Sequence, residues 1–237
     1  MKMSYVIETK DLCKIYNQGE HNEVRAIEHV NLKVEEGEFL AVIGPSGSGK
    51  STLLHMVGAL DKPTRGSVLI DGEDINSMSS DELANIRLNK IGFVFQTFNL
   101  ISGVSAVDNV LMPLVPRGVS GSKRRYAKEL LHKFGIGKRA NHDPSELSGG
   151  EKQRVAIARS LINNPKIILA DEPTGQLDSK TGKDIIKLMR ELNREKNLTF
   201  VIVTHDESLL KYVKRVVRLK DGRIISDLKN GKLAHFK

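Results

Sequence analysis

The segment Gly44-Pro-Ser-Gly-Ser-Gly-Lys-Ser-Thr52 constrains the fold of this chain more than any other part of the sequence. It follows the apolar run 39–43 and precedes the helical pattern of residues 53–60. The spacing G-x-x-x-x-G-K-S in a strand, loop and helix context is typical of a phosphate-binding loop. Its glycines let the backbone curl, so that successive N–H groups and a helix amino terminus face an anion. The alternative is a Gly/Ser-rich turn that binds nothing.

Two side chains of this loop predict the chemistry of its ligand. Lys50 adds a positive charge for the β- and γ-phosphates of a nucleotide, and the Ser51 hydroxyl is a candidate ligand of Mg²⁺. The sequence therefore predicts the core of a P-loop NTPase that binds ATP with Mg²⁺. The nucleotide-binding residues predicted from this motif are Gly44, Pro45, Ser46, Gly47, Ser48, Gly49, Lys50, Ser51 and Thr52.

Short apolar runs predict an α/β fold. Residues 39–43, 167–170 and 200–203 are rich in Val, Ile and Leu, and each precedes a polar loop and a helical pattern. This alternation favours a mostly parallel sheet. The β-prone runs 5–7 and 30–34 indicate a second, flanking sheet.

That flanking sheet is expected to be antiparallel. Residues 68–70 form another short β-prone run and end in the turn signal Asp71-Gly72. By contrast, the strand signal disappears between about 99 and 160, and residues 126–134 and 153–162 carry apolar side chains at helical spacing. The sequence therefore predicts an antiparallel β subdomain and an inserted helical subdomain beside the parallel core.

Composition restricts the class of protein. The chain has 237 residues and 39% hydrophobic content, enough for a core, and its apolar runs are far shorter than the roughly 20 residues of a membrane-spanning helix. The first ten residues show no secretory signal, and the single Cys13 excludes an intramolecular disulfide and a multi-cysteine zinc site. We expect a cytoplasmic protein. The net charge of +8 fits nucleic acid, an anionic membrane surface or a nucleotide, and does not choose among them.

Two adjacent carboxylates end the apolar run 167–170. Asp171 can hold the hydration shell of Mg²⁺, and Glu172 is then a candidate general base for an attacking water. Consecutive strand residues point to opposite faces, so the two carboxylates can address different partners. An apolar run that ends in Asp-Glu is also ordinary at strand ends, but the phosphate loop in the same chain favours the catalytic interpretation.

A second candidate anion site is Leu147-Ser-Gly-Gly-Glu151, which is followed by the helical pattern 152–159. A serine and two glycines at a helix start supply a hydroxyl and N–H groups, although the same residues can be a simple N-cap. Together with the phosphate loop, this segment resembles the ABC ATPases. The resemblance implies that Ser148, Gly149, Gly150 and Glu151 bind the γ-phosphate held by a second copy of the chain.

The resemblance assigns roles to three more side chains. It implies that Gln96 contacts Mg²⁺ and the attacking water, that His205 contacts the γ-phosphate and orients Glu172, and that adenine stacks on Tyr16. Each has a plainer alternative, since an isolated glutamine carries no information, a histidine at a strand end is often structural, and Tyr16 can pack between the small sheet and the core. The predicted catalytic residues are thus Glu172, His205 and Gln96, and the predicted metal ligands are Ser51, Gln96 and Asp171.

The segment 175–178 resembles the loop through which two ABC subunits contact each other. Asp178 is the predicted dimer-interface residue. Gln176 departs from the small residue expected there and puts the details of that contact in doubt. Glu151 replaces a more frequent glutamine and puts little in doubt.

The resemblance covers residues 5–225 and predicts one ABC ATPase domain over 1–237. Its core would span about 1–98 and 160–237, and its helical subdomain about 99–159. Residues 98–102, 107–113 and 171–175 resemble the branch of lipoprotein-release, macrolide-export and antimicrobial-peptide-resistance ATPases.

That branch implies particular partners. They are a second copy of the chain and an integral membrane permease with an extracytoplasmic domain, which would hold the chain on the inner face of the membrane and export peptide, drug or lipoprotein. The alternatives are a regulatory ATPase that only transmits force and a soluble ABC ATPase that acts on nucleic acid. With one cassette, one cysteine and no sustained heptads, we expect no nucleic-acid partner. The substrate, the direction of transport and the permease itself lie outside the sequence.

Four apolar side chains follow or precede Gln96 closely. Phe95, Phe98, Leu100 and Ile101 can line a groove that receives a helix of the permease. The alternative is that they belong to the core of the helical subdomain.

Overall fold

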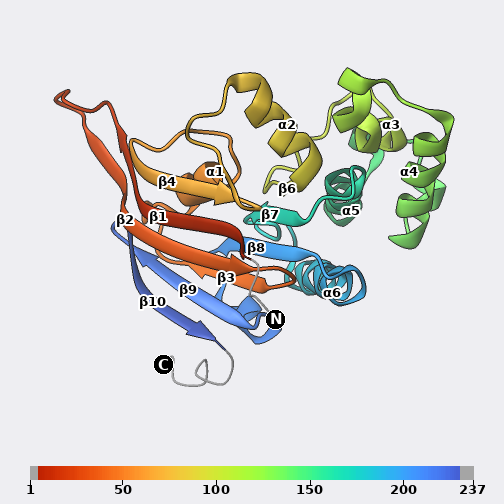
Figure 1. The fold of residues 1–237 in the computed structure, drawn as a ribbon. Coiled ribbons are helices and arrows are strands. Elements are labelled where there is room, and N and C mark those ends of the chain that lie inside the picture. The colour runs from red at the N-terminus through yellow and green to blue at the C-terminus, as the bar shows by residue number, and fades with distance from the viewer. Residues whose placement is uncertain (1–4, 230–237) are drawn as a thin grey trace.

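A six-stranded sheet lies at the centre of the computed structural model, which describes residues 5–229 (Figure 1). Its strand order is β10-β9-β3-β8-β7-β6, with all neighbours parallel except the edge strand β10. The strands are β3 (Phe39–Ile43), β6 (Ile91–Val94), β7 (Ile167–Asp171), β8 (Thr199–Thr204), β9 (Arg215–Lys220) and β10 (Arg223–Lys229). The mostly parallel sheet and its three expected apolar strands are confirmed.

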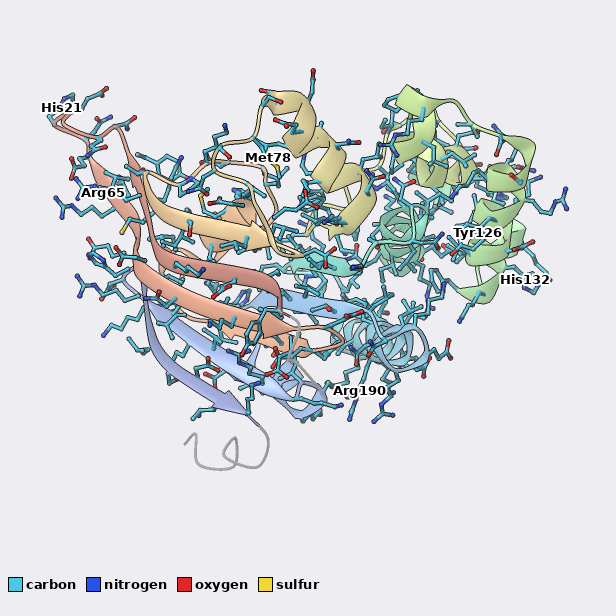
Figure 2. The ribbon with its side chains drawn as sticks, in the orientation of Figure 1. His21, Arg65, Met78, Tyr126, His132 and Arg190 are labelled. Atoms are coloured by element: carbon cyan, nitrogen blue, oxygen red, sulfur yellow. The ribbon has the colours of Figure 1, made fainter. Side chains whose placement is uncertain are left out.

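The second sheet is antiparallel, as predicted, and has the order β2-β1-β4-β5. Its long first hairpin ends in the loop 17–23, and Figure 2 shows His21 at the tip of that loop, away from the body of the protein. The expected β-prone runs are parts of longer strands. The strands are β1 (Tyr5–Tyr16), β2 (Val24–Glu35), β4 (Arg65–Ile70) and β5 (Glu73–Asp74).

Helices cover the central sheet, and those between β6 and β7 form a separate layer at one side of the molecule (Figure 1). Among residues 5–229, the stretch between Val94 and Ile167 contains no strand, in agreement with the loss of strand signal there. The division of the chain at about 99 and 159 stays a prediction, and α5 extends past it. The helices are α1 (Lys50–Val57), α2 (Ser80–Lys90), α3 (Ala106–Leu111), α4 (Gly121–Lys133), α5 (Gly149–Leu161) and α6 (Ser179–Lys196), with short 3-10 turns η1 (Met112–Arg117), η2 (Gly137–Arg139), η3 (Pro144–Glu146) and η4 (Glu207–Tyr212).

The strand β3 separates two hydrophobic cores. Its side chains alternate, so Phe39, Ala41 and Ile43 pack with the helices α3 to α6, whereas Leu40 and Val42 pack with α1 and the antiparallel sheet. All five are buried because the strand has neighbours on both sides and layers on both faces. The phosphate-loop strand is therefore fully enclosed, as is its neighbour β8.

Several elements were not predicted, namely α2, β6, β9 and β10. The start of α2 did carry a signal, because Ser79 and Glu82 form a capping box in which each side chain accepts the other's backbone N–H. The single cysteine is buried, and its sulfur accepts the backbone N–H of His29.

A buried arginine ties the two sheets together. Arg215 on β9 is 5% exposed and donates to the Lys33 carbonyl on β2, to Glu38, and with two nitrogens to Asp227 on β10. The guanidinium thus satisfies acceptors from both sheets at once. Arg223 makes a similar pair with Glu28, but in solvent.

We predict that Arg215→Met lowers the free energy of unfolding by about 3–5 kcal/mol, because it leaves the largely covered Glu38 carboxylate without its main partner. Arg223→Met is the matched control and should leave stability nearly unchanged, because its pair is exposed. Urea denaturation followed by circular dichroism measures both. Equal urea midpoints for the two variants would show that the ion pairs of Arg215 contribute no more to stability than the exposed pair of Arg223.

Candidate functional site

Four parallel strands bring the predicted site residues to one edge of the central sheet. Ile43 at the end of β3 pairs with Thr204 at the end of β8, and Asp171 at the end of β7 pairs with Val203. Val94 at the end of β6 pairs with Ala170. Because these strands are parallel, the loops that leave them emerge side by side, which is where open α/β sheets bind ligands.

The phosphate loop joins β3 to α1 and depends on two close approaches. A Cβ on Gly44 would lie 2.1 Å from the Leu219 carbonyl oxygen, and one on Gly49 would lie 2.3 Å from the Ala26 carbonyl oxygen. Gly49 is also left-handed, with φ of 97°, and it caps α1 without a side-chain hydrogen bond. The first N–H groups of α1 therefore remain available for an anion.

Lys50 lies inside this loop. Its ammonium group donates to the carbonyl oxygens of Gly44 and Pro45, at 2.9 Å each, and its side chain is largely buried. Ser48 is also buried, and its hydroxyl has no hydrogen-bond partner among the described residues. The loop thus holds a positive charge and a free hydroxyl in a fixed backbone cradle, which fits a polyphosphate.

Ser51 and Asp171, which are 120 positions apart in sequence, lie together. The Ser51 hydroxyl donates to Asp171 Oδ1 at 3.3 Å. Burial raises the pKa of Asp171, and the Ser51 hydroxyl partly opposes that rise. A hydroxyl and a half-buried carboxylate are oxygen ligands of the kind that Mg²⁺ prefers, so these two side chains fit the predicted metal site.

Glu172 lies just beyond β7, with a left-handed backbone at φ of 45°. The alternation expected along a strand is therefore the wrong reason for the separation of the two carboxylates, because Glu172 has already left the strand. Its backbone N–H donates to the Val203 carbonyl, which holds this turn against β8. A non-glycine residue in this conformation is uncommon and indicates a backbone held in place by its surroundings.

Two side chains from the end of β8 hold the Glu172 carboxylate. The Thr204 hydroxyl donates to Oε2 at 3.1 Å, and His205 Nδ1 lies 2.8 Å from Oε1. His205 is exposed, whereas the Glu172 side chain is mostly covered. The predicted pair of Glu172 and His205 is thus in direct contact, and Thr204 is a third member that sequence reasoning missed.

Gln96 follows β6 and is exposed. Its amide nitrogen lies 2.8 Å from the position a Cβ on Gly175 would occupy, so the glutamine side chain rests against the turn that follows Glu172. A Cβ at position 175 would require the Gln96 side chain to move. Gln96 is therefore beside the predicted base.

Tyr16 lies at the end of β1, and its hydroxyl donates to Asp61 at 3.2 Å. The Lys14 ammonium lies 4.9 Å from the centre of its ring. The same hairpin contacts the phosphate loop, because Ala26 on β2 touches Gly49. The ring is half-buried and lies on the element that packs against the loop, as an adenine platform requires.

The second candidate anion site is the start of α5. Ser148 caps this helix, and its hydroxyl and N–H both donate to the Glu151 carboxylate, at 2.8 and 2.9 Å. Glu151 also pairs with Arg139 at 3.3 Å. Glu151 is therefore the second member of the Ser148 capping box, and the N–H groups of Gly149 and Gly150 lie in the first turn, where helical N–H groups have no intrahelical acceptor.

Asp178 caps α6 by accepting the N–H groups of Lys180 and Thr181. It also accepts the Thr181 hydroxyl at 2.5 Å, and that bond holds the pKa of Asp178 below its usual range. Gln176 is exposed. The segment between Glu172 and α6 is thus fixed at both ends and presents Gln176 to solvent.

Two further side chains fix the loop after Gln96, and sequence reasoning missed both. Arg159 at the end of α5 donates to the carbonyls of Phe98, at 2.7 Å, and Asn99, which both have left-handed backbones. The fully buried Asn109 exchanges hydrogen bonds with the backbone of Ile101 and donates to Val104. The sequence did offer two signals. Arg159 is a cation within the mostly apolar segment 155–162, and Asn109 is an amide within the mostly apolar segment 106–111.

The four apolar side chains near Gln96 do not share one environment. Phe95 lines a groove of about 470 Å³ and Leu100 packs on the core of the helical layer, whereas Phe98 is half-buried and Ile101 is exposed. The groove lies between α2 and the helices that follow β6. Its lining includes Leu60, Leu88, Phe93, Phe95, Pro113 and Arg159.

Fold and site together define a class. A phosphate loop after a parallel strand, a contacting Ser–Asp pair beside it, a held carboxylate and a helical insertion are typical of a nucleotide-hydrolysing P-loop enzyme. The family model described as "ABC transporter" matches residues 27–175 of the chain. The chain therefore belongs to the ABC transporter family and is an ATPase of that family.

Individual relatives agree with this assignment. The chain is 49% identical to the lipoprotein-releasing system ATP-binding protein LolD of Geobacter metallireducens, covering 95% of this chain and all of that protein. It is 46% identical to the macrolide export protein MacB of Hyphomonas neptunium, covering 97% of this chain but 35% of MacB. A dimeric structure of the ABC transporter cassette MJ0796 matches with a TM-score of 0.86 and 49% identity, covering 94% and 98% of the two chains. MJ0796 is from Methanocaldococcus jannaschii.

No helix between residues 5 and 229 combines the length and apolar character that a membrane crossing requires.

We predict that Tyr16→Ala weakens ATP binding about 10- to 100-fold, because stacking of a base on an aromatic ring contributes about 1–3 kcal/mol. Tyr16→Phe keeps the ring and loses only the hydrogen bond to Asp61, so its dissociation constant should stay near that of the wild type. Isothermal titration calorimetry with ATP measures both variants. If the two variants bind equally weakly, the hydroxyl and not the ring matters, and the stacking assignment is wrong.

Proposed function

We propose that this chain is the ATP-hydrolysing subunit of an ABC exporter, acting as a dimer of two copies on a separate membrane permease. The observation that carries the catalytic part is the Glu172 carboxylate, held by Thr204 and His205 beside the phosphate loop. The relatives LolD and MacB support the exporter class.

In this proposal the chain's own residues divide the work of hydrolysis. Lys50 and the first N–H groups of α1 bind the β- and γ-phosphates and stabilise charge on the transferred group. Glu172 accepts a proton from a water molecule as its oxygen attacks the γ-phosphorus, and the bond to ADP breaks. His205 orients Glu172. Mg²⁺, held through Ser51 and Asp171 with Gln96 nearby, supplies charge neutralisation when bound.

The dimer follows from the two phosphate-binding helix starts. Figure 1 shows α1 and α5 well apart in one chain, so the two starts do not meet on one phosphate. A second copy can bring the start of its α5 to the nucleotide on α1. The dimeric structures of MJ0796, one of them with ADP and Pi, support this arrangement for a relative of 48–49% identity. Asp178 and the exposed Gln176 would then lie at the subunit interface.

The groove lined by Phe95 is the proposed contact with the permease. It is largely apolar and lies directly beside the loop that carries Gln96, so a helix seated in it would contact the loop that senses nucleotide. Arg159 forms part of its lining and holds that same loop by the Phe98 carbonyl. A permease with an extracytoplasmic domain, held at the inner face of the membrane, is the partner we infer from this branch of the family.

We predict that Glu172→Gln lowers the rate of ATP hydrolysis at least about 100-fold, because general-base catalysis contributes at least that factor. ATP binding should persist, so the variant should elute as a dimer in ATP with Mg²⁺ during size-exclusion chromatography. Glu191→Gln, an exposed change on α6, is the control and should hydrolyse ATP normally. Normal hydrolysis by Glu172→Gln would eliminate the base assignment.

The permease proposal has its own test. Glu172→Gln carrying an affinity tag should co-purify from native membranes, in ATP with Mg²⁺, with near-equal amounts of an integral membrane protein that has an extracytoplasmic domain. Adding Leu60→Glu should abolish that recovery, because Leu60 is exposed and lines the groove. Adding Ile225→Glu, at an exposed apolar site on β10 away from the groove, should not. Mass spectrometry identifies the partner.

The outcomes separate the competing functions. Recovery of only soluble protein or nucleic acid would overturn the transporter assignment. Loss of the permease with Ile225→Glu as well as Leu60→Glu would show that the groove is not the contact.

A further inference from the structure

Helix α5 carries a buried amide that the proposed mechanism does not yet use. Gln153 is fully buried, and its Nε2 donates to the Pro173 carbonyl at 2.6 Å. Pro173 directly follows Glu172, the proposed base. One side chain of α5 is therefore bonded to the backbone next to the catalytic carboxylate.

The other end of the same amide is not satisfied. Gln153 Oε1 is buried and has no hydrogen-bond partner among residues 5–229. A buried acceptor without a partner is destabilising, but an apolar side chain of the same shape would leave the buried Pro173 carbonyl without its donor. The contribution of this glutamine is therefore its one directed hydrogen bond to Pro173.

The first turn of α5 also sits directly on the segment that follows Glu172. A Cβ on Gly149 would meet Leu177 at 3.2 Å, and one on Gly150 would meet Thr181 at 2.6 Å. The two glycines let the helix start approach this segment closely. A movement of the helix start would therefore displace the segment 172–181. Gln153 adds a hydrogen bond from the helix to Pro173 in that segment.

The turn at Glu172 can transmit that movement to the carboxylate. The Gly175 N–H donates to the Glu172 carbonyl at 3.0 Å, so residues 172–175 form one hydrogen-bonded turn that contains Pro173. The backbone of Glu172 is in a left-handed conformation that its surroundings must maintain. The hydrogen bond from Gln153 to the Pro173 carbonyl is one of the contacts that maintain this conformation.

We propose that Gln153 is a positioning residue that links the start of α5, where the partner's ATP would bind, to the placement of Glu172 in its own chain. This inference rests on the proposed dimer, in which each α5 start contacts the nucleotide of the other copy. Binding at one nucleotide site would then set the catalytic geometry at the other, so the two sites would hydrolyse ATP cooperatively.

The test is Gln153→Met, which keeps an unbranched side chain of similar length and removes both polar atoms. Initial rates against ATP concentration give kcat, KM and the Hill coefficient. We expect kcat to fall about 10- to 100-fold, as for a misplaced catalytic group, with KM nearly unchanged and the Hill coefficient reduced toward independent sites. In the Glu172→Gln background, ATP-dependent dimers should persist with Gln153→Met.

Asn193→Leu is the matched control. Asn193 on α6 is also a buried amide, and it donates to the carbonyls of Gly37 and Leu198, at the other end of β3 from the phosphate loop. It should lower the melting temperature without changing the Hill coefficient. This separates a loss of folded protein from a loss of coupling.

Three results would overturn the inference. Wild-type kcat and Hill coefficient in Gln153→Met would remove any role for the amide. A fall in activity with an unchanged Hill coefficient, in step with lost stability as in Asn193→Leu, would make Gln153 merely structural. Absence of ATP-dependent dimers in Glu172→Gln alone would instead overturn the proposed dimer, and the coupling with it.

Discussion

The parallel hydrogen bonding of β6, β7, β8 and β3 is the constraint on which the site depends. These strands are distant in sequence, and only their common direction and register bring the phosphate loop, Gln96, Asp171 and His205 to one edge. A shift of one residue in the pairing of β7 with β8 would turn the Asp171 side chain to the other face of the sheet and displace the turn at Glu172. The buried, alternating side chains of β3 and its neighbours on both faces fix that register.

The helical layer is attached to this edge by a few polar side chains. Arg159 and Asn109 hold the backbone of the loop after Gln96, and Gln153 holds the turn after Glu172. Burial lowers the pKa of the Arg159 guanidinium, although arginine stays charged in proteins. The helical layer therefore contacts the catalytic edge through directed hydrogen bonds to backbone atoms, and its position relative to the core affects the site directly.

Much of this arrangement could be predicted from the sequence. The phosphate loop, Asp171 and the strands 39–43, 167–170 and 200–203 carry local signals, since glycine spacing and apolar runs act over a few residues. The contacts of Thr204, Gln153 and Arg159 could not be predicted, because each joins segments whose meeting depends on strand order and helix packing. The left-handed backbone of Glu172 could not be predicted either, because none of the residue types next to it requires that conformation.

Glu151 shows a further limit of pattern reasoning. Its position in the motif predicts a nucleotide contact, which stays a prediction, and in the structure its carboxylate accepts hydrogen bonds from the Ser148 hydroxyl and N–H. The same residue spacing, S-x-x-E, is also that of a capping box, and the two functions share one pattern.

The alternation of side chains along β3 has a consequence for how the protein unfolds locally. Because one face of this strand packs into the helical side and the other into the antiparallel side, the two cores share a wall but few side chains. Each core can act as its own cooperative unit, so amides of the helical layer can exchange with solvent while those around α1 stay protected. The helical layer, which carries part of the groove proposed for the permease, can thus open locally while the phosphate loop and α1 stay folded.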